Sequence, residues 1–168
     1  MKALWENLFA HWYKQENPTK TVIKQIPVFH ELTNKQIREI ENLVHKRRYK
    51  SGETVFKQHA PGEGMFIILS GKIKIFTEDK QKTKKTLALL GNGEFFGELS
   101  LLDSDTRSAT AIAHEDCLLL AFLRPDLQSL SKRSPETGNK ILFNLAKIIS
   151  ARLRKTSEEI TETSSGSV

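Results

Sequence analysis

Short apolar segments separated by glycine-containing turns run from residue 51 to residue 122, and they constrain the fold more than any other feature. The stretch KIKIF at residues 72–76 alternates charged and apolar side chains, so a strand there would point its lysines outward and its isoleucines inward. Residues 65–69 form a continuous apolar run, which suits a strand buried on both faces. Strands at a spacing of roughly 8–12 residues predict a jelly-roll-like β-barrel.

Helical patterns flank these strands on both sides, so the predicted fold class is α+β, mainly β. Before the strands, Thr33 is a suitable N-cap for a helix whose buried face would carry Ile37 and Ile40. After them, the residues SPE at 134–136 predict the start of a long helix. We expect that helix to end near residue 161, because the remaining residues are rich in Ser, Thr and Gly.

The predicted long helix carries an apolar stripe at steps of three and four residues. Much of this stripe extends beyond what a small barrel could cover, so a coiled seam with a second copy would bury it. We therefore expect a homodimer, and the alternative is a helix that lies only on its own barrel. The stripe consists of Leu142, Leu145, Ile149, Leu153, Thr156 and Ile160.

Residues 3–15 show helical periodicity with an aromatic face that includes Trp5 and Trp12. This predicted helix would pack on its own domain or on a second copy, or it would contact an effector or a membrane surface. The basic run at residues 45–50 is expected to be a solvated face rather than a nucleic-acid contact. We divide the chain into an N-terminal helix and linker (1–25), the barrel with flanking helices (26–133), the long helix (134–161) and a disordered tail (162–168).

The net charge and the cysteine content restrict the cellular compartment and the binding partners that we expect for this chain. The chain has 168 residues and a net charge of +6, which allows weak attraction to nucleic acid or anionic lipid without indicating either. The single cysteine, Cys117, excludes a disulfide within the chain and suits a buried thiol in a reducing compartment. No apolar run approaches the roughly 20 residues of a membrane helix, and no signal peptide is visible, so a cytoplasmic location is expected.

Residues 96–110 carry the side chains best suited to binding a ligand. Gly97 and the short apolar run after it predict one or two helical turns, whose first amide groups and positive dipole end suit an anion. The carboxylate of Glu98 would repel a phosphate, so we expect it to accept hydrogen bonds from sugar hydroxyls. Arg107 adds a permanent charge on a planar fork of donors. Together these residues predict a site for a ribose that carries one compact phosphate.

The sequence FGELSLLDSDTRSAT at residues 96–110 resembles the phosphate-binding cassette of cyclic-nucleotide-binding domains, although Thr106 stands where many members have Pro. The resemblance covers about residues 26–160 and includes MFIILSGKIKIF at 65–76. It implies that Glu98 binds the ribose 2′-hydroxyl and that Arg107 pairs with the cyclic phosphate. The other residues expected to line this site are Gly97, Leu99, Ser100, Ser108 and Ala109.

The sequence ARLRKTSEE at residues 151–159 is similar to the long dimer helix of the bacterial cAMP receptor proteins, in which a Thr-Ser pair contacts the adenine. The corresponding pair here is Thr156 and Ser157, whose hydroxyls could both donate and accept hydrogen bonds. Ordinary polarity near a helix end is the alternative interpretation. The resemblance implies cAMP as the ligand, with cGMP as the second choice and no metal.

These observations favour a non-enzymatic cyclic-nucleotide sensor that is homodimeric and relays ligand occupancy through its C-terminal helix. Two alternatives are the ligand-binding half of a transcription regulator whose DNA-binding domain is missing, and a structural dimer that binds no nucleotide. The chain stops about where the DNA-binding module of the receptors would begin, so DNA binding by this chain is not expected, and an effector protein could receive the signal. Jelly-roll oxygenases need clustered His and Glu ligands, whereas the five histidines are scattered, so we predict no catalytic or metal site.

Overall fold

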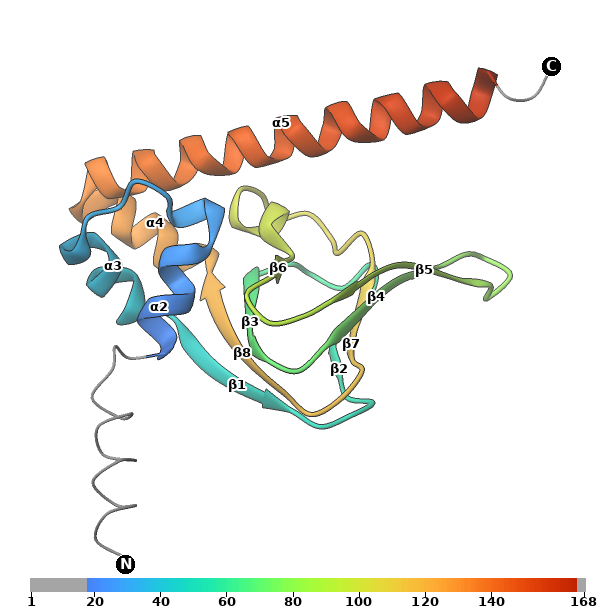
Figure 1. The fold of residues 1–168 in the computed structure, drawn as a ribbon, viewed down its shortest axis with the longest axis horizontal. Coiled ribbons are helices and arrows are strands. Elements are labelled where there is room, and N and C mark those ends of the chain that lie inside the picture. Colours follow the sequence, from blue (N-terminus) through green and yellow to red (C-terminus); the bar gives the residue numbers. More distant parts are fainter. Residues whose placement is uncertain (1–17, 166–168) are drawn as a thin grey trace, which may run out of the picture.

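The computed structural model describes residues 18–165 and contains a β-barrel, a group of short helices at one end of it, and the long helix α5 (Figure 1). The helix predicted over residues 3–15 lies outside the described residues, as do residues 166–168. No helix within the described part is long and apolar enough to cross a membrane.

Two four-stranded antiparallel sheets form the barrel, in the orders β1-β8-β3-β6 and β2-β7-β4-β5. Eight strands that cross between two sheets in this way make a jelly roll, so the predicted fold class is confirmed. The strands are β1 (His45–Tyr49), β2 (Thr54–Phe56), β3 (Gly64–Ser70), β4 (Ile73–Glu78), β5 (Lys84–Leu90), β6 (Phe95–Phe96), β7 (Thr110–Ala113) and β8 (Cys117–Leu123).

Two groups of buried apolar side chains stabilise the barrel and its contact with the helices. Successive residues of β3 point to opposite faces, so Ile68 packs inside the barrel while Ile67 packs against the helices. The prediction that residues 65–69 form a strand buried on both faces is therefore confirmed. Leu119 and Leu120 of β8 divide between the two groups in the same way. Each such side chain contributes about 1.5–3 kcal/mol through burial.

The basic run at residues 45–50 contains an edge strand that the sequence analysis did not predict. β1 pairs antiparallel with β8, from His45 opposite Ala121 to Tyr49 opposite Cys117. The side chains of residues 45–48 are exposed, so their predicted solvation is confirmed. The strand was missed because an edge strand needs no apolar alternation, and charged side chains there prevent pairing with another chain.

The helices at the end of the barrel begin earlier than expected. Residues 18–25, assigned to a linker from the sequence, form helix α2 (Pro18–Gln25), and its Ile23 is fully buried. Helix α3 (Asn34–Glu41) starts as predicted, because Thr33 and Gln36 form a capping box: Gln36 N donates to Thr33 Oγ1, and Thr33 N donates to Gln36 Oε1. The 3-10 helix η1 (Pro27–Phe29) and helix α4 (Arg124–Arg133) complete this group.

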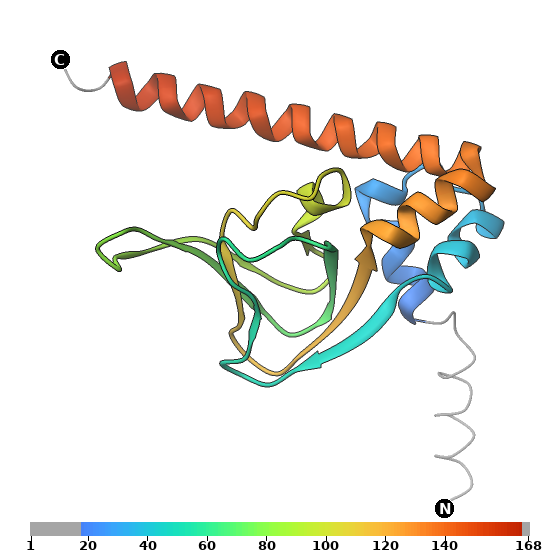
Figure 2. The same ribbon diagram turned by 180° about the vertical axis from the view of Figure 1, so that it is seen from behind.

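Helix α5 (Pro135–Ser165) begins at the predicted proline and continues beyond the predicted end at residue 161, so residues 162–165 are helical and not part of a disordered tail. The hydroxyls of Thr156, Ser157 and Thr161 donate to carbonyls one turn earlier, which accommodates these polar residues within the helix. Seen from behind, α5 runs from the short helices across the end of the barrel (Figure 2).

One side of α5 packs on its own domain and another side is open. Leu145 is fully buried, and the amide of Asn144 donates to the carbonyls of Val28 (3.3 Å) and His30 (2.9 Å). Within the predicted stripe, by contrast, Leu142 is 38% exposed and Leu153 is 65% exposed. The side chain of Ile160 lies outside the described part. The stripe therefore divides between the domain core and a surface open in the single chain.

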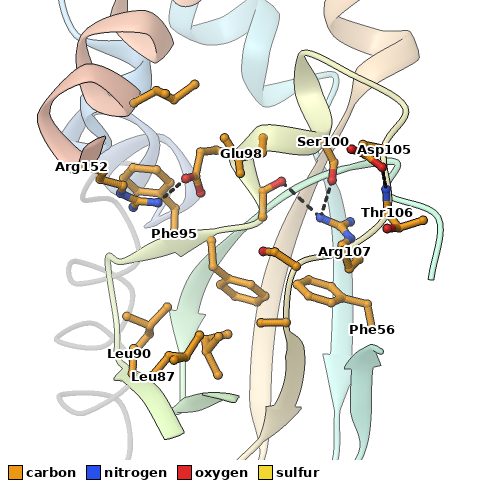
Figure 3. A pocket seen from close by; sticks show the side chains of 18 of the residues that line it. Phe56, Leu87, Leu90, Phe95, Glu98, Ser100, Asp105, Thr106, Arg107 and Arg152 are labelled. Atoms are coloured by element: carbon orange, nitrogen blue, oxygen red, sulfur yellow. Dashed lines mark hydrogen bonds and ion pairs between the residues drawn. The ribbon is translucent and has the colours of Figure 1, made fainter. Parts of the chain in front are cut away.

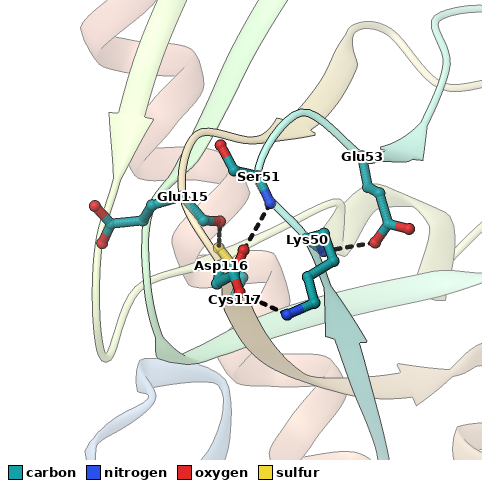
Figure 4. A network of polar contacts seen from close by, with 6 residues as sticks. All are labelled: Lys50, Ser51, Glu53, Glu115, Asp116 and Cys117. Carbon is teal, nitrogen blue, oxygen red and sulfur yellow. Dashed lines mark hydrogen bonds and ion pairs between the residues drawn. The ribbon is translucent and has the colours of Figure 1, made fainter.

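A polar network joins the end of β1 to the start of β8 (Figure 4). The carboxylate of Asp116 accepts hydrogen bonds from Lys50 Nζ and from Ser51 N, both at 2.9 Å, and these bonds lower the pKa of Asp116. Beside it, Cys117 Sγ donates to the carbonyl oxygens of Lys72 and Glu115. Burial raises the pKa of the Cys117 thiol, which fits the predicted role of a packed, protonated side chain.

Candidate functional site

A cavity of about 630 Å³ opens between residues 96–110, the β4–β5 hairpin and α5 (Figure 3). The fold brings eight of the nine predicted site residues to this cavity, although they come from segments far apart in the sequence. Ser157 is the exception, because it is not among the lining residues of this chain. The eight are Gly97, Glu98, Leu99, Ser100, Arg107, Ser108, Ala109 and Thr156.

The predicted short helix is the single 3-10 turn η2 (Glu98–Leu101). Gly97 precedes it with φ +76°, a left-handed conformation that residues with a Cβ rarely adopt. A Cβ at this position would lie 2.6 Å from Arg107 Nη1. Glycine is therefore required here both for the backbone conformation and for the close approach of the guanidinium.

Arg107 is buried beside η2, with only 6% of its surface exposed. Its Nη1 donates to the carbonyl oxygen of Gly97 (3.2 Å) and to Ser100 Oγ (3.0 Å), so Ser100 orients this side chain. Its Nε is buried without a hydrogen-bond partner among the described residues. Burial lowers the pKa of Arg107, while the negative charges of Glu63 and Glu98 act in the opposite direction. The site thus holds a buried cation beside the cavity.

Glu98 is buried as well, and its carboxylate forms an ion pair with Arg152 of α5. The guanidinium of Arg152 also lies 5.4 Å from the ring centroid of Phe95. Arg152 was not predicted as a site residue from the sequence. It could have been found, because it precedes Thr156 by one helical turn and so shares its helix face.

The two hydroxyls predicted to contact a base are placed differently. Thr156 lines the cavity, and its Oγ1 donates to the carbonyl of Arg152 at 3.0 Å. Ser157 donates to the carbonyl of Leu153 and lies outside the cavity lining. The role of either residue in ligand binding stays a prediction.

The cavity therefore has two chemically different regions. Near η2 it offers a buried guanidinium and a buried carboxylate, which suit an anion and hydroxyl groups respectively. Toward β4 and β5 the lining is mostly apolar, from Ile75, Leu87 and Leu90. Among residues 18–165, no group of three or more His, Cys, Asp or Glu side chains is placed to hold a metal ion.

A sequence model of the cyclic nucleotide-binding domain matches residues 46–134, which include the strands and the cassette. The chain belongs to this family. The family and the jelly-roll barrel that the resemblance predicted are therefore confirmed.

Relatives of this cyclic nucleotide-binding domain include regulators and channels. The cyclic AMP receptor protein of Thermus thermophilus is 38% identical over 138 residues, covering 82% of this chain and 62% of that protein. A cyclic nucleotide-gated potassium channel of Rhizobium etli is 30% identical over 145 residues, covering 83% of this chain and 39% of the channel. The crystal structure of the Thermus thermophilus catabolite activator protein superimposes with a TM-score of 0.74 over 82% of this chain and 63% of that one, at 38% identity. The chain thus spans less than two thirds of the length of these relatives.

Proposed function

We propose that this chain is a non-enzymatic cyclic-nucleotide sensor that prefers cAMP to cGMP, acts as a homodimer and relays ligand occupancy through α5. One observation carries the proposal: a buried arginine and a buried carboxylate line the same cavity. Arg107 would pair with the cyclic phosphate and Glu98 would accept hydrogen bonds from the ribose hydroxyl. Neither charge alone would distinguish this ligand from an inorganic anion.

The preference for adenine rests on Thr156. Its hydroxyl hydrogen is engaged by the carbonyl of Arg152, so the oxygen is left as an acceptor toward the cavity. The amino group of adenine is a donor and would match it, whereas the carbonyl oxygen of guanine is an acceptor and would not. The apolar lining around Leu87 and Leu90 would pack on the faces of either base.

The relay rests on the contribution of α5 to the cavity. Arg152 and Thr156 are on α5, while Glu98 and Arg107 belong to the barrel. A ligand that contacts both parts binds more tightly to one arrangement of helix and barrel than to others, and this difference in affinity is what shifts a population. The open apolar residues Leu142 and Leu153 offer a surface on which the helix of a second copy would pack.

The proposal is tested by calorimetric titration of the purified chain with cAMP and with cGMP. Arg107→Ala should keep the fold, as judged by circular dichroism, and weaken cAMP binding at least about 30-fold, because the phosphate would lose its charged partner. Arg154→Ala removes an exposed arginine of α5 outside the cavity lining, and it should bind as the wild type does. Equal affinities of Arg107→Ala and wild type would refute the role of Arg107. Failure of the wild type to bind either nucleotide would favour a structural dimer.

The base preference has its own test. Thr156→Val is close in shape and removes only the hydroxyl, so it should weaken cAMP binding by about tenfold while changing cGMP binding much less. If Thr156→Val weakens the binding of cAMP and of cGMP by the same factor, the proposed contact with the adenine amino group is contradicted.

A further inference from the structure

Three phenylalanines pack beneath the candidate phosphate site. The ring centroid of Phe56 lies 5.9 Å from that of Phe66 and 5.8 Å from that of Phe96, and Phe66 and Phe96 are stacked at 5.5 Å. The guanidinium carbon of Arg107 lies 4.1 Å above the Phe56 centroid and 5.9 Å from that of Phe66. Figure 3 shows the Phe56 ring directly beside the Arg107 side chain. A cation this close to a ring face is attracted by the negative charge density of the ring.

The aromatic contact matters because no carboxylate within residues 18–165 forms an ion pair with Arg107, although the charges of Glu63 and Glu98 act on it from a greater distance. Its hydrogen bonds go to a carbonyl and to a hydroxyl, and the neighbouring Glu98 is paired with Arg152. Burial lowers the pKa of Arg107, because desolvation disfavours the charged form. An ion pair with a carboxylate would stabilise the cation, but it would also compete with an anionic ligand. A ring face stabilises the cation without occupying its donors.

The hydrogen bonds of Arg107 and the Phe56 ring restrain the guanidinium in different directions. The two bonds from Nη1 fix the guanidinium toward Gly97 and Ser100 within its own plane, while Phe56 limits its movement perpendicular to that plane. Arg107 is thereby held at the cavity lining, where a ligand would meet it. Orientation before the ligand arrives reduces the conformational entropy lost on binding.

We propose that Phe56 is a positioning residue for phosphate recognition: its ring holds the Arg107 guanidinium in the binding orientation without neutralising it. The inference rests on the proposed function, because it takes the cyclic phosphate as the anion that Arg107 binds. Phe56 lies at the end of β2, which pairs with β7 just after Arg107, so the barrel fold itself sets their separation.

The test replaces Phe56 with mono-, di- and trifluorophenylalanine, which weaken the ring's attraction for a cation stepwise with little change of shape. The dissociation constant for cAMP should rise with each fluorine and reach about three- to thirty-fold for the trifluoro variant. The same series at Phe29, which packs edge-on against Phe122 in the helix core and away from the cavity lining, is the matched control and should leave the constant unchanged. A flat response at position 56, or an equal rise at position 29, would overturn the proposal.

A second measurement separates this inference from the proposed function. In the nucleotide-free protein, the NMR signals of the Arg107 side chain should be shifted by the Phe56 ring current, and Phe56→Leu should remove that shift. If the Arg107 signals are shifted by the ring current but the protein binds neither cAMP nor cGMP, the proposed function is refuted, although Phe56 does pack on Arg107. Arg107 signals at ordinary positions, unchanged by Phe56→Leu, would overturn the positioning role even if the wild type binds cAMP.

Discussion

Glu98 and Arg152 form an ion pair between the cassette and the long helix, although 54 residues separate them in the sequence. The Glu98 side chain is buried, with 6% of its surface exposed, whereas the Arg152 side chain is 54% exposed. The pair therefore links the residue expected to bind the ribose directly to α5. A ribose hydroxyl that reaches Glu98 would meet a carboxylate already held by the helix.

The first prediction concerns the strength of this link. In a double-mutant cycle of Glu98→Gln and Arg152→Gln, urea denaturation of the nucleotide-free protein should give a favourable coupling of about 1 kcal/mol, because Arg152 is largely solvated and its charge is screened. The more exposed pair Lys50–Asp116, treated identically with Lys50→Gln and Asp116→Asn, should show a smaller coupling, because solvent screens both of its charges. Additive effects at Glu98 and Arg152 would show that the contact contributes nothing to stability.

The second prediction uses two glycines with the same backbone conformation. Gly97 (φ +76°) and Gly93 (φ +79°) would both be strained by a Cβ, at a cost of about 1–2 kcal/mol. Only at Gly97 would the Cβ also press on Arg107 Nη1, since nothing lies within 4 Å at Gly93. Gly97→Ala should weaken cAMP binding by about tenfold or more, and Gly93→Ala should leave it within about twofold, as measured by calorimetry. Similar losses in both variants would mean that strain alone is responsible.

The third prediction concerns Asn144, whose amide donates to two backbone carbonyls of the neighbouring segment. Asn144→Asp would place a buried carboxylate against those carbonyls and should lower the free energy of unfolding by about 3 kcal/mol at pH 7. Such a carboxyl has a folded-state pKa above its unfolded value, so its protonated form is favoured on folding. The loss of unfolding free energy in Asn144→Asp should therefore be smallest at acid pH and should grow as the pH rises.

The exposed Asn139 of the same helix provides the control for this variant. Asn139→Asp should leave the unfolding free energy nearly unchanged between pH 4 and pH 7, because its side chain is solvated in both states. A pH-independent loss in Asn144→Asp would show that the introduced charge does not face the carbonyls.

The fourth prediction tests the dimer that the open side of α5 suggests. Leu153→Glu should convert the proposed homodimer into a monomer in sedimentation velocity experiments, because a charge would replace an apolar seam residue. Leu89→Glu alters a leucine of β5 that is 52% exposed, and it should leave the assembly intact. A wild-type protein that is monomeric at tens of micromolar would refute the homodimer.

Local pattern was sufficient for several strands of the barrel and for much of the site. The alternation at residues 72–76 and the apolar run at 65–69 became β4 and β3, because side-chain direction in a strand follows from sequence parity. Thr33 initiated its helix for an equally local reason. Glu98 and Arg107 came together as expected, since one short turn connects them. The charged strand β1 and the helix α2 were missed, because their partners rather than their own patterns stabilise them.

The sequence by itself determined the strand pattern typical of a jelly roll, its glycine turns and the identity of the charged residues in the cassette, because each depends on neighbours within a few positions. Only the tertiary structure decided that Arg152 pairs with Glu98, that Phe56 lies under Arg107 and that Ser157 stays outside the cavity lining. Those relationships depend on how α5 crosses the barrel and on the register of β2 with β7. Such long-range geometry is set by the packing of the whole core and leaves no periodic trace in the chain.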